Sequence, residues 1–279
     1  MDKEVKISFI FLLILLIACF LLPSFIDYGE YEIFYDESGT RVLSMENRSL
    51  AHLLGTDKKG QDVFIRLLYG GRLSLLLAFA AVILQSVIGI GVGLLAGYKG
   101  KRTDMILMRI TDVFNALPDL VIILILSSVM VAYGIGGKDR ILMLMLFLAG
   151  FGWTFVAKIV RSQTLYIRES AFMMAAELCG ISTLRRLTLH LLPNVMGQVL
   201  AVIPVSIGNI ILTEATLSFL GFGLPYPYAS WGNMLTAAMD TNILANHPHI
   251  WVPPGLLIFS TVAAFHILGK GLKNRRWGE

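Results

Sequence analysis

The sequence predicts an all-α protein that crosses a membrane several times, and three observations support this. First, 56% of the 279 residues are hydrophobic and only 15% are charged, whereas soluble domains carry about 25% charged residues. Second, the apolar residues gather in runs of about 20 residues, the length that a helix needs to cross a bilayer. Third, these runs lack the apolar–polar alternation of a transmembrane barrel, so their backbone groups are expected to pair within helices.

Six such runs are present, which predicts six transmembrane helices. Pro118 is expected to kink the third span, because proline cannot continue a regular helix. The fourth span is expected to end near Lys158, whose long side chain can reach the membrane surface. The predicted spans are 7–26, 73–98, about 108–137, 141–157, 195–220 and 250–268.

Lys and Arg residues concentrate in the connections on one side of the predicted bundle. With the N-terminus inside, 15 of the 23 Lys and Arg residues fall in cytoplasmic parts and 8 fall outside. Most of the outer residues lie in the long loop 27–72, where the positive-inside rule is weak. We therefore expect both termini and the loop 161–193 to be cytoplasmic. The same bias accounts for the basic pI without any binding of nucleic acid.

This topology divides the chain into four segments. Residues 1–26 are predicted to be an N-terminal anchor helix. Cys19 resembles part of a lipoprotein cleavage box, but the apolar run continues to Ile26, which favours an uncleaved anchor. Residues 27–72 are expected to form an extracytoplasmic loop, 73–272 a helical core and 273–279 a cytoplasmic tail.

The loop 161–193 is a long polar interruption of the core, and its pattern predicts two short helices. Ser170 is a candidate N-cap for a first helix that stops near Gly180, and Ser182 is a candidate N-cap for a second. Pro193 fits the first turn of the next span.

Four residues of the first short helix have the composition of a docking surface. Ala175 and Ala176 are small and allow close approach, while Phe172 and Met173 form an apolar knob beside them. An ordinary helix–turn–helix lying on the membrane surface is the alternative that this pattern leaves open.

Polar side chains within the spans are candidates for a translocation path. An ionisable group such as Glu214 is costly inside a membrane and is a functional candidate by default; a carboxylate satisfied by neighbouring helices is the alternative. Gln198 and Asn209 could line the same cavity or bond between helices. Arg109 and Asp112 are three residues apart and are expected to form a structural ion pair.

Other features have structural interpretations. Gly89, Gly93 and Gly97 share one helical face and predict close packing against another helix. Asp57 and Asp62 are expected to be solvated loop carboxylates. The cysteines, Cys19 and Cys179, are expected in a span and in a cytoplasmic loop, which does not suit a disulfide.

His247 and His249 are the one candidate pair for a metal. They flank a proline, but no carboxylate, Cys or third His is near in sequence, so a metal site is not expected. The sequence also lacks a phosphate-binding loop and the common catalytic motifs. If the chain transports a substrate, the energy is expected to come from another polypeptide, received at the loop 161–193.

That loop resembles the EAA loop of ABC-importer permeases, whose pattern is E-A-A-x-x-x-G followed by x-L-P. Here it reads Met174-Ala175-Ala176-Glu177-Leu178-Cys179-Gly180, then Leu192-Pro193-Asn194. Further segments are similar to the dipeptide/oligopeptide/nickel permeases, and within them to the second-permease, or C-type, subunit. They occur in the family's order between about residues 50 and 272. They include Gly55-Thr56-Asp57 with Gly60-Gln61-Asp62, Gly70 to Leu75, Val160 to Gln163, Glu214 to Gly221 and Ser230 to Met234.

The resemblance implies a type I ABC importer permease fold and a non-enzymatic, multi-pass subunit of the inner membrane. It implies that a helix of the loop enters a groove on an ATP-binding subunit. The residues assigned to this coupling are Phe172, Met173, Met174, Ala175, Ala176, Glu177, Gly180 and Pro193. The residues of the extracytoplasmic family segment are Gly55, Thr56, Asp57, Gly60 and Asp62.

The implied partners are a sister B-type permease, two ATP-binding subunits, an extracytoplasmic binding protein, a peptide cargo and membrane lipid. ATP and magnesium are expected on the ATPase subunits, and no cofactor is expected on this chain. Nickel or a metal chelate is the alternative cargo, and a membrane enzyme or scaffold is a remote alternative.

Three positions depart from the family pattern. Met174 replaces the usual Glu of the motif, and Glu177, about one helical turn along, is the candidate to substitute for it. Gln61 replaces the usual Arg, and Lys270 stands where Asp is common. The small residues Ala175 and Ala176 match the pattern, so coupling is expected to be preserved.

Overall fold

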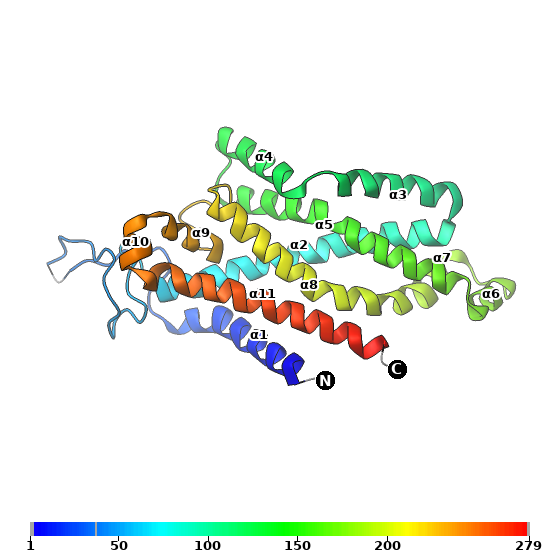
Figure 1. Cartoon of the computed structure of the whole chain (residues 1–279), viewed down its shortest axis with the longest axis horizontal. Coiled ribbons are helices and arrows are strands. Elements are labelled where there is room, and N and C mark those ends of the chain that lie inside the picture. The colour runs from blue at the N-terminus through cyan, green and yellow to red at the C-terminus, as the bar shows by residue number, and fades with distance from the viewer. Residues whose placement is uncertain (1–2, 37, 278–279) are drawn as a thin grey trace.

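A computed structural model describes residues 3–36 and 38–277, and within these ranges the chain is helical, with two isolated bridges and no longer strand. Figure 1 shows an elongated bundle. The predicted all-α class is confirmed. The elements are α1 (Lys3–Leu21), η1 (Leu22–Phe25), α2 (Val63–Lys99), α3 (Lys101–Ala116), α4 (Asp119–Ala132), α5 (Gly137–Arg168), α6 (Ala171–Leu178), α7 (Thr183–Arg185), η2 (Arg186–Leu191), α8 (Leu192–Phe219), α9 (Trp231–Leu235), η3 (Thr236–Met239), α10 (Thr241–Asn246) and α11 (Pro248–Trp277).

Five helical stretches of the described chain are long and apolar enough to cross a membrane, and α3 with α4 makes a sixth if this bent pair is one span. The pair bends by 74°. Pro118 occupies the position just before α4, where a residue without a backbone N–H ends the preceding helix. The predicted break at Pro118 is therefore confirmed. The stretches are Lys3–Phe25, Val63–Lys99, Gly137–Arg168, Thr183–Phe219 and Pro248–Asn274.

The second span begins earlier than the sequence predicts. The loop 27–72 was expected to end at Arg72, but α2 starts at Val63 directly after Asp62. The basic residue Arg66 made this stretch look polar, yet its side chain is buried and contacts Gln61 and Asp57. An internal partner thus allows a charged residue to lie within the first turn of a membrane-spanning helix.

Close packing of α2 on α5 follows from the glycine stripe. A Cβ atom added to Gly93 would lie 2.6 Å from the Ala157 carbonyl oxygen, and one added to Gly97 would lie 2.6 Å from Thr164 Cβ. Gly89 is equally close to Val156. The predicted helix–helix contact is confirmed, and any side chain on this face would separate the two helices.

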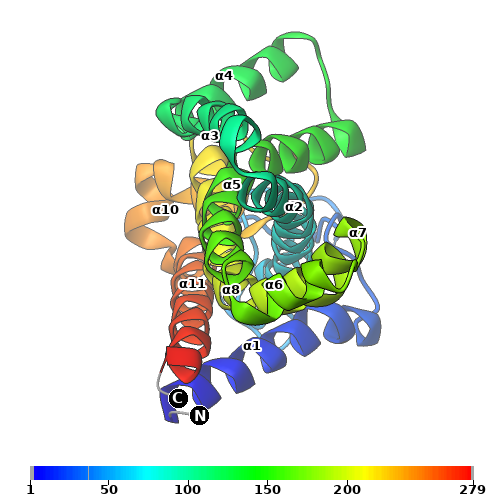
Figure 2. The same ribbon diagram turned by 90° about the vertical axis from the view of Figure 1, so that its right-hand side faces the viewer.

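The helices surround a central group of α2, α5 and α8. Figure 2 shows α1 and α11 on one side of this group and α3 with α4 on the opposite side. Trp231 of α9 is fully buried and its indole N–H donates to the Leu67 carbonyl at 3.0 Å. The indole packs where Gly71 leaves room. This contact fixes α9 against the start of α2.

The bundle has two distinct ends (Figure 1). One end carries α6 and α7, and we call it the α6 end. The other carries α9, α10 and the irregular segment 27–62, and we call it the α9 end. We continue to predict that the α6 end is cytoplasmic.

Candidate functional site

The predicted docking segment lies at the α6 end (Figure 1), where α6 is a separate short helix, whereas α7 continues through η2 into α8 as one helical stretch, Thr183–Phe219. Met173 and Ala176 are buried, at 2% and 8% exposure, and Met173 packs in an apolar cluster with Leu191 and Val195. The outward side chains are apolar as well: Leu178 is 89% exposed. The exposed apolar residues of α6 are Ala171, Phe172, Met174, Ala175 and Leu178.

This arrangement corrects the predicted docking surface. Ala176 and Met173 do not face outward but hold α6 to the rest of the chain. Two of the eight predicted coupling residues are thus buried, and the other six are exposed: Phe172, Met174, Ala175, Glu177, Gly180 and Pro193. Leu178, which sequence reasoning did not select, is the most exposed of the large apolar side chains on α6.

Backbone hydrogen bonds end α6 where the sequence predicts. The Ile181 N–H donates to the Ala176 carbonyl at 3.1 Å and the Gly180 N–H to the Glu177 carbonyl at 3.0 Å. These two bonds make a Schellman motif, in which Gly180 takes the left-handed conformation with φ of 71°. Ser170 and Ser182 occupy the predicted N-cap positions, but neither makes the expected side-chain cap bond. The Ser170 hydroxyl donates backward to the Ile167 carbonyl.

An ion pair joins α6 to the start of η2. Arg186 Nη1 lies 2.9 Å from Glu177 Oε2, and the Arg186 guanidinium also faces the Tyr98 ring at the end of α2. Glu177 was predicted to replace the motif carboxylate lost at Met174 and to reach a partner. Its carboxylate instead pairs within the chain.

Further charged contacts brace the α6 end. Arg168 donates to the carbonyls of Gly97 and Tyr98, both at 3.1 Å, and so caps the end of α2. Asp112 pairs with Lys158 at 2.9 Å. The predicted pairing of Asp112 with Arg109 is therefore wrong, because the tertiary contact between α3 and α5 supplies a different cation.

Glu214 lies at a junction of three helices near the α9 end. It is 1% exposed, and its carboxylate accepts hydrogen bonds from the hydroxyls of Ser218 at 2.7 Å, Ser230 at 2.9 Å and Ser74 at 3.2 Å. These serines come from α8, the residue before α9, and α2. The carboxylate is thus satisfied by neighbouring elements, as the structural alternative expects, while a translocation role stays a prediction.

The three predicted path residues do not form one site. Asn209 lines a cavity of about 250 Å³ between α2, α4, α5 and α8, together with Gln85 and Asp119. Neither Glu214 nor Gln198 lines this cavity. Gln85 and Asp119 were missed, since only their meeting in the folded chain distinguishes them from other polar residues of the spans.

At the α9 end, the family segment 55–62 is a structured connection. Asp62 is buried, accepts from the Ile65 N–H at 2.9 Å as the N-cap of α2, and lies 2.7 Å from His52 Nδ1. The Tyr28 hydroxyl also donates to this carboxylate, at 3.3 Å. Burial and the charge of Asp62 raise the pKa of the Tyr28 hydroxyl. Asp62 was predicted to be solvated, and this is wrong.

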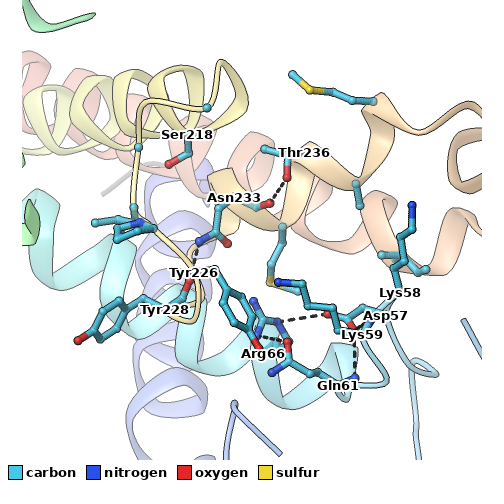
Figure 3. A pocket seen from close by; sticks show the side chains of 18 of the residues that line it. Asp57, Lys58, Lys59, Gln61, Arg66, Ser218, Tyr226, Tyr228, Asn233 and Thr236 are labelled. Atoms are coloured by element: carbon cyan, nitrogen blue, oxygen red, sulfur yellow. Dashed lines mark hydrogen bonds and ion pairs between the residues drawn. The ribbon is translucent and has the colours of Figure 1, made fainter. Parts of the chain in front are cut away.

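Asp57 organises the turn before α2. Its carboxylate accepts from the N–H groups of Lys59 at 2.8 Å and Gln61 at 3.0 Å and lies 3.6 Å from Arg66 Nε. Gln61, which replaces a usual Arg, is buried and accepts from Arg66 Nη1 at 2.7 Å. Asp57 therefore has structural partners, as Figure 3 shows.

The glycines and threonine of this segment also have defined places. A Cβ on Gly55 would collide with the Glu46 carbonyl, and its φ of 76° favours glycine. The Gly60 carbonyl accepts from the Phe34 N–H at 2.9 Å, and Thr56 is fully buried. These contacts hold the segment 27–62 together, and the Val63 N–H, which donates to the Gly55 carbonyl at 3.0 Å, joins it to the start of α2.

A pocket of about 680 Å³ opens beside this segment (Figure 3). Its wall combines the turn before α2, the first turn of α5, the connection between α8 and α9, and α10. Arg66, Tyr226 and Tyr228 contribute polar groups, and Leu224 and Met234 contribute apolar ones. Sequence reasoning did not find this pocket, because its walls are far apart in the chain.

Comparison with known protein families identifies the family to which this helical bundle belongs. Residues 89–276 match the family described as "Binding-protein-dependent transport system inner membrane component". The chain belongs to this family. It is therefore a multi-pass component of an ABC transporter in the inner membrane, a transport subunit rather than an enzyme.

Curated relatives extend the match to the N-terminal part. The chain is 31% identical over 275 residues to the oligopeptide transport system permease protein OppC of Bacillus subtilis, covering 98% of this chain and 85% of the relative. It is 38% identical over 226 residues to the dipeptide transport system permease protein DppC of the same organism, covering 81% and 68%. The resemblance to the C-type branch is thereby confirmed.

A solved structure supports the fold. The crystal structure of an amino acid ABC transporter with histidines aligns with a TM-score of 0.55 at 17% identity, and covers 75% of this chain and 94% of that one. At this identity the similarity concerns the fold alone. The predicted permease architecture is confirmed by it.

Proposed function

We propose that this chain is the C-type permease of an ATP-driven importer and forms, with a sister B-type permease, the membrane path for di- and oligopeptides. An external binding protein delivers the peptide, and two ATP-binding subunits, which hold ATP and magnesium, supply the energy. The relatives named for oligopeptide and dipeptide transport, at 31% and 38% identity, support the cargo.

The coupling role is supported by the way α6 divides into a buried face and an exposed apolar face. Its residues Met173 and Ala176 are buried and α6 packs beside α5 and η2, while Phe172, Met174 and Leu178 remain exposed at the tip of the molecule. Exposed apolar side chains on a braced helix favour a partner groove rather than solvent. The partner we assign is an ATP-binding subunit.

The native cysteines allow a direct test of this assignment. Cys179 follows α6 and is exposed, whereas Cys19 is buried. In the purified transporter, a thiol-directed photocrosslinker should attach at Cys179 and link this chain to the nucleotide-hydrolysing companion. Cys179→Ser should abolish the link. Purification of an active transporter with no such companion at Cys179 contradicts the proposal.

A substitution on the same surface tests function. Leu178→Asp should leave the fold intact, because the side chain is 89% exposed, yet should separate ATP hydrolysis from peptide uptake. Uptake and hydrolysis are measured in the same reconstituted vesicles. Unchanged uptake by Leu178→Asp would place the coupling surface elsewhere.

No structural observation favours nickel as the cargo. The rings of His247 and His249 lie 5.7 Å apart, and within the described residues no group of three or more His, Cys, Asp or Glu side chains is placed to hold a metal ion. Reconstituted vesicles should take up a labelled dipeptide but not radioactive nickel, and this comparison distinguishes the two cargoes.

A further inference from the structure

Charges in the pocket at the α9 end do not balance (Figure 3). Two of its four cationic side chains have carboxylate partners: Arg66 lies 3.6 Å from Asp57, and Lys58 lies 2.9 Å from Asp240. The other two have none among the described residues. The six charged side chains of the lining are Lys58, Lys59, Arg66, Arg140, Asp57 and Asp240.

Arg140 is the more informative of the two unpaired cations. It lies in the first turns of α5, is 8% exposed and lines the pocket. Within residues 3–36 and 38–277 its guanidinium has no ion pair and no hydrogen bond. The other buried arginines of this range, Arg66 and Arg186, each have a carboxylate. A buried charge without a partner is costly, so Arg140 is poised for an anion that the chain does not provide.

Lys59 adds a second positive group. Its ammonium nitrogen lies 3.1 Å from the centroid of the Tyr226 ring. Partial desolvation and the nearby Arg66 guanidinium lower the pKa of Lys59, although the residue is exposed. An anion in the pocket would oppose this shift, because a nearby negative charge favours the charged ammonium.

The rest of the wall suits a small organic molecule. The pocket volume of about 680 Å³ falls within the range of small-ligand sites, roughly 300–1,000 Å³. Two methionines contribute to the wall, and thioether side chains adapt to ligands of varied shape. The apolar lining consists of Val63, Leu224, Pro225, Met234, Ala237, Met239, Ile243 and Ile250.

We propose that this pocket binds the C-terminal carboxylate of a short peptide, with Arg140 and Lys59 as its cationic partners and the apolar wall as the contact for its side chains. A guanidinium matches a carboxylate in a planar, two-bond arrangement. The inference rests on the proposed function and assigns a peptide-receiving site to this permease. A concave, partly apolar pocket with a buried arginine favours a small ligand over an acidic loop of a docked protein, whose charged contacts are usually at an exposed rim.

The test compares trialanine with trialanine amide, which lacks the carboxylate. The intact transporter, purified through a tag on this chain and free of binding protein, is titrated with each peptide. We expect trialanine to bind about tenfold more tightly than the amide, the range for a hydrogen bond to a charged group. In Arg140→Gln this preference should vanish, and in Arg140→Lys it should be partly kept.

Lys138→Gln is the matched control. It removes the same formal charge from the same helical turn, but Lys138 is exposed and does not line the pocket. It should keep the full preference. The thermal stability of Arg140→Gln without peptide should equal or exceed that of the native protein, because an unpaired buried charge is removed. Trialanine should then stabilise the native transporter but not this variant.

Three results would overturn the proposal. One is equal binding of the two peptides by the native transporter, and another is absence of saturable trialanine binding. The third is a loss of binding-protein docking in Arg140→Gln with the peptide preference unchanged, which would assign the carboxylate to the binding protein. A failure of the proposed peptide import can be distinguished from these results. In that case reconstituted vesicles would take up neither trialanine nor its amide, even with binding protein present.

Discussion

Glu177 and Arg186 form an ion pair of 2.9 Å that spans the turn between the two short helices of the α6 end. The two sides differ in environment: the Glu177 side chain is 69% exposed, whereas that of Arg186 is 10% exposed. The pair connects the proposed partner-facing helix to η2, which continues directly into α8. A displacement of α6 is thereby linked to a membrane span.

Removal of the Glu177 carboxylate alone should lower stability at least as much as removal of both charges of the pair. Glu177→Ala leaves Arg186 buried without its partner and is expected to lower stability by about 1 kcal/mol, a modest figure because the pair is partly solvated. The double variant Glu177→Ala/Arg186→Met should be at least as stable as Glu177→Ala. Thermal unfolding of the purified transporter measures this. A double variant less stable than Glu177→Ala would show that Arg186 acts mainly through Tyr98.

The small-residue contact between α2 and α5 predicts a position-specific effect. Gly93→Ala places a Cβ 2.6 Å from the Ala157 carbonyl oxygen and 2.7 Å from Val160 Cβ. Separation of the helices is expected to cost roughly 1–3 kcal/mol, as for other overpacked cores. Gly91→Ala is the control, because nothing lies within 4 Å of its added Cβ. If both variants melt at the same temperature, the close contact is not required.

Much of the fold could be predicted because the signals were local. Apolar runs gave the spans, Pro118 gave the break, and Gly180 gave the end of α6. Two predictions were wrong because partners come from elsewhere in the chain: Asp62 is held by His52 and Tyr28, and Asp112 pairs with Lys158 rather than Arg109. The orientation of the bundle remains a prediction.

The candidate sites were harder to predict than the fold. The α6 end was located from its motif, but which face is exposed depends on how α6 packs on η2. Ser74 and Glu214 are 140 residues apart in sequence and meet only in the folded chain. The pocket at the α9 end likewise joins Arg140 to a turn before α2, and no spacing in the sequence indicates this meeting.

Glu214 should tolerate an amide better than an apolar side chain. Glu214→Gln keeps an oxygen acceptor among the three serines, whereas Glu214→Leu leaves their hydroxyls without one. Each unsatisfied buried hydroxyl costs about 1–3 kcal/mol, so the Leu variant should be recovered from membranes at much lower yield. Thr216→Ala is the control, because this exposed hydroxyl bonds only within its own helix. Normal assembly and uptake by Glu214→Leu would contradict the structural role.

Asp62 is expected to determine where α2 begins. Asp62→Ala removes the N-cap bond to the Ile65 N–H, at a cost of about 1 kcal/mol, and also leaves His52 without its carboxylate at the buried contact of 2.7 Å. Asp62→Asn keeps the cap and should lose less stability. Since the segment 27–62 is tied to α2 through this residue, the Ala variant should also expose that segment to protease. Limited proteolysis of vesicles that present the α9 end measures this, with Asn47→Ala, a change at an exposed position of the same segment, as the control. Equal cleavage of the Asp62→Ala and Asn47→Ala proteins would show that the contacts of Asp62 do not hold the segment in place.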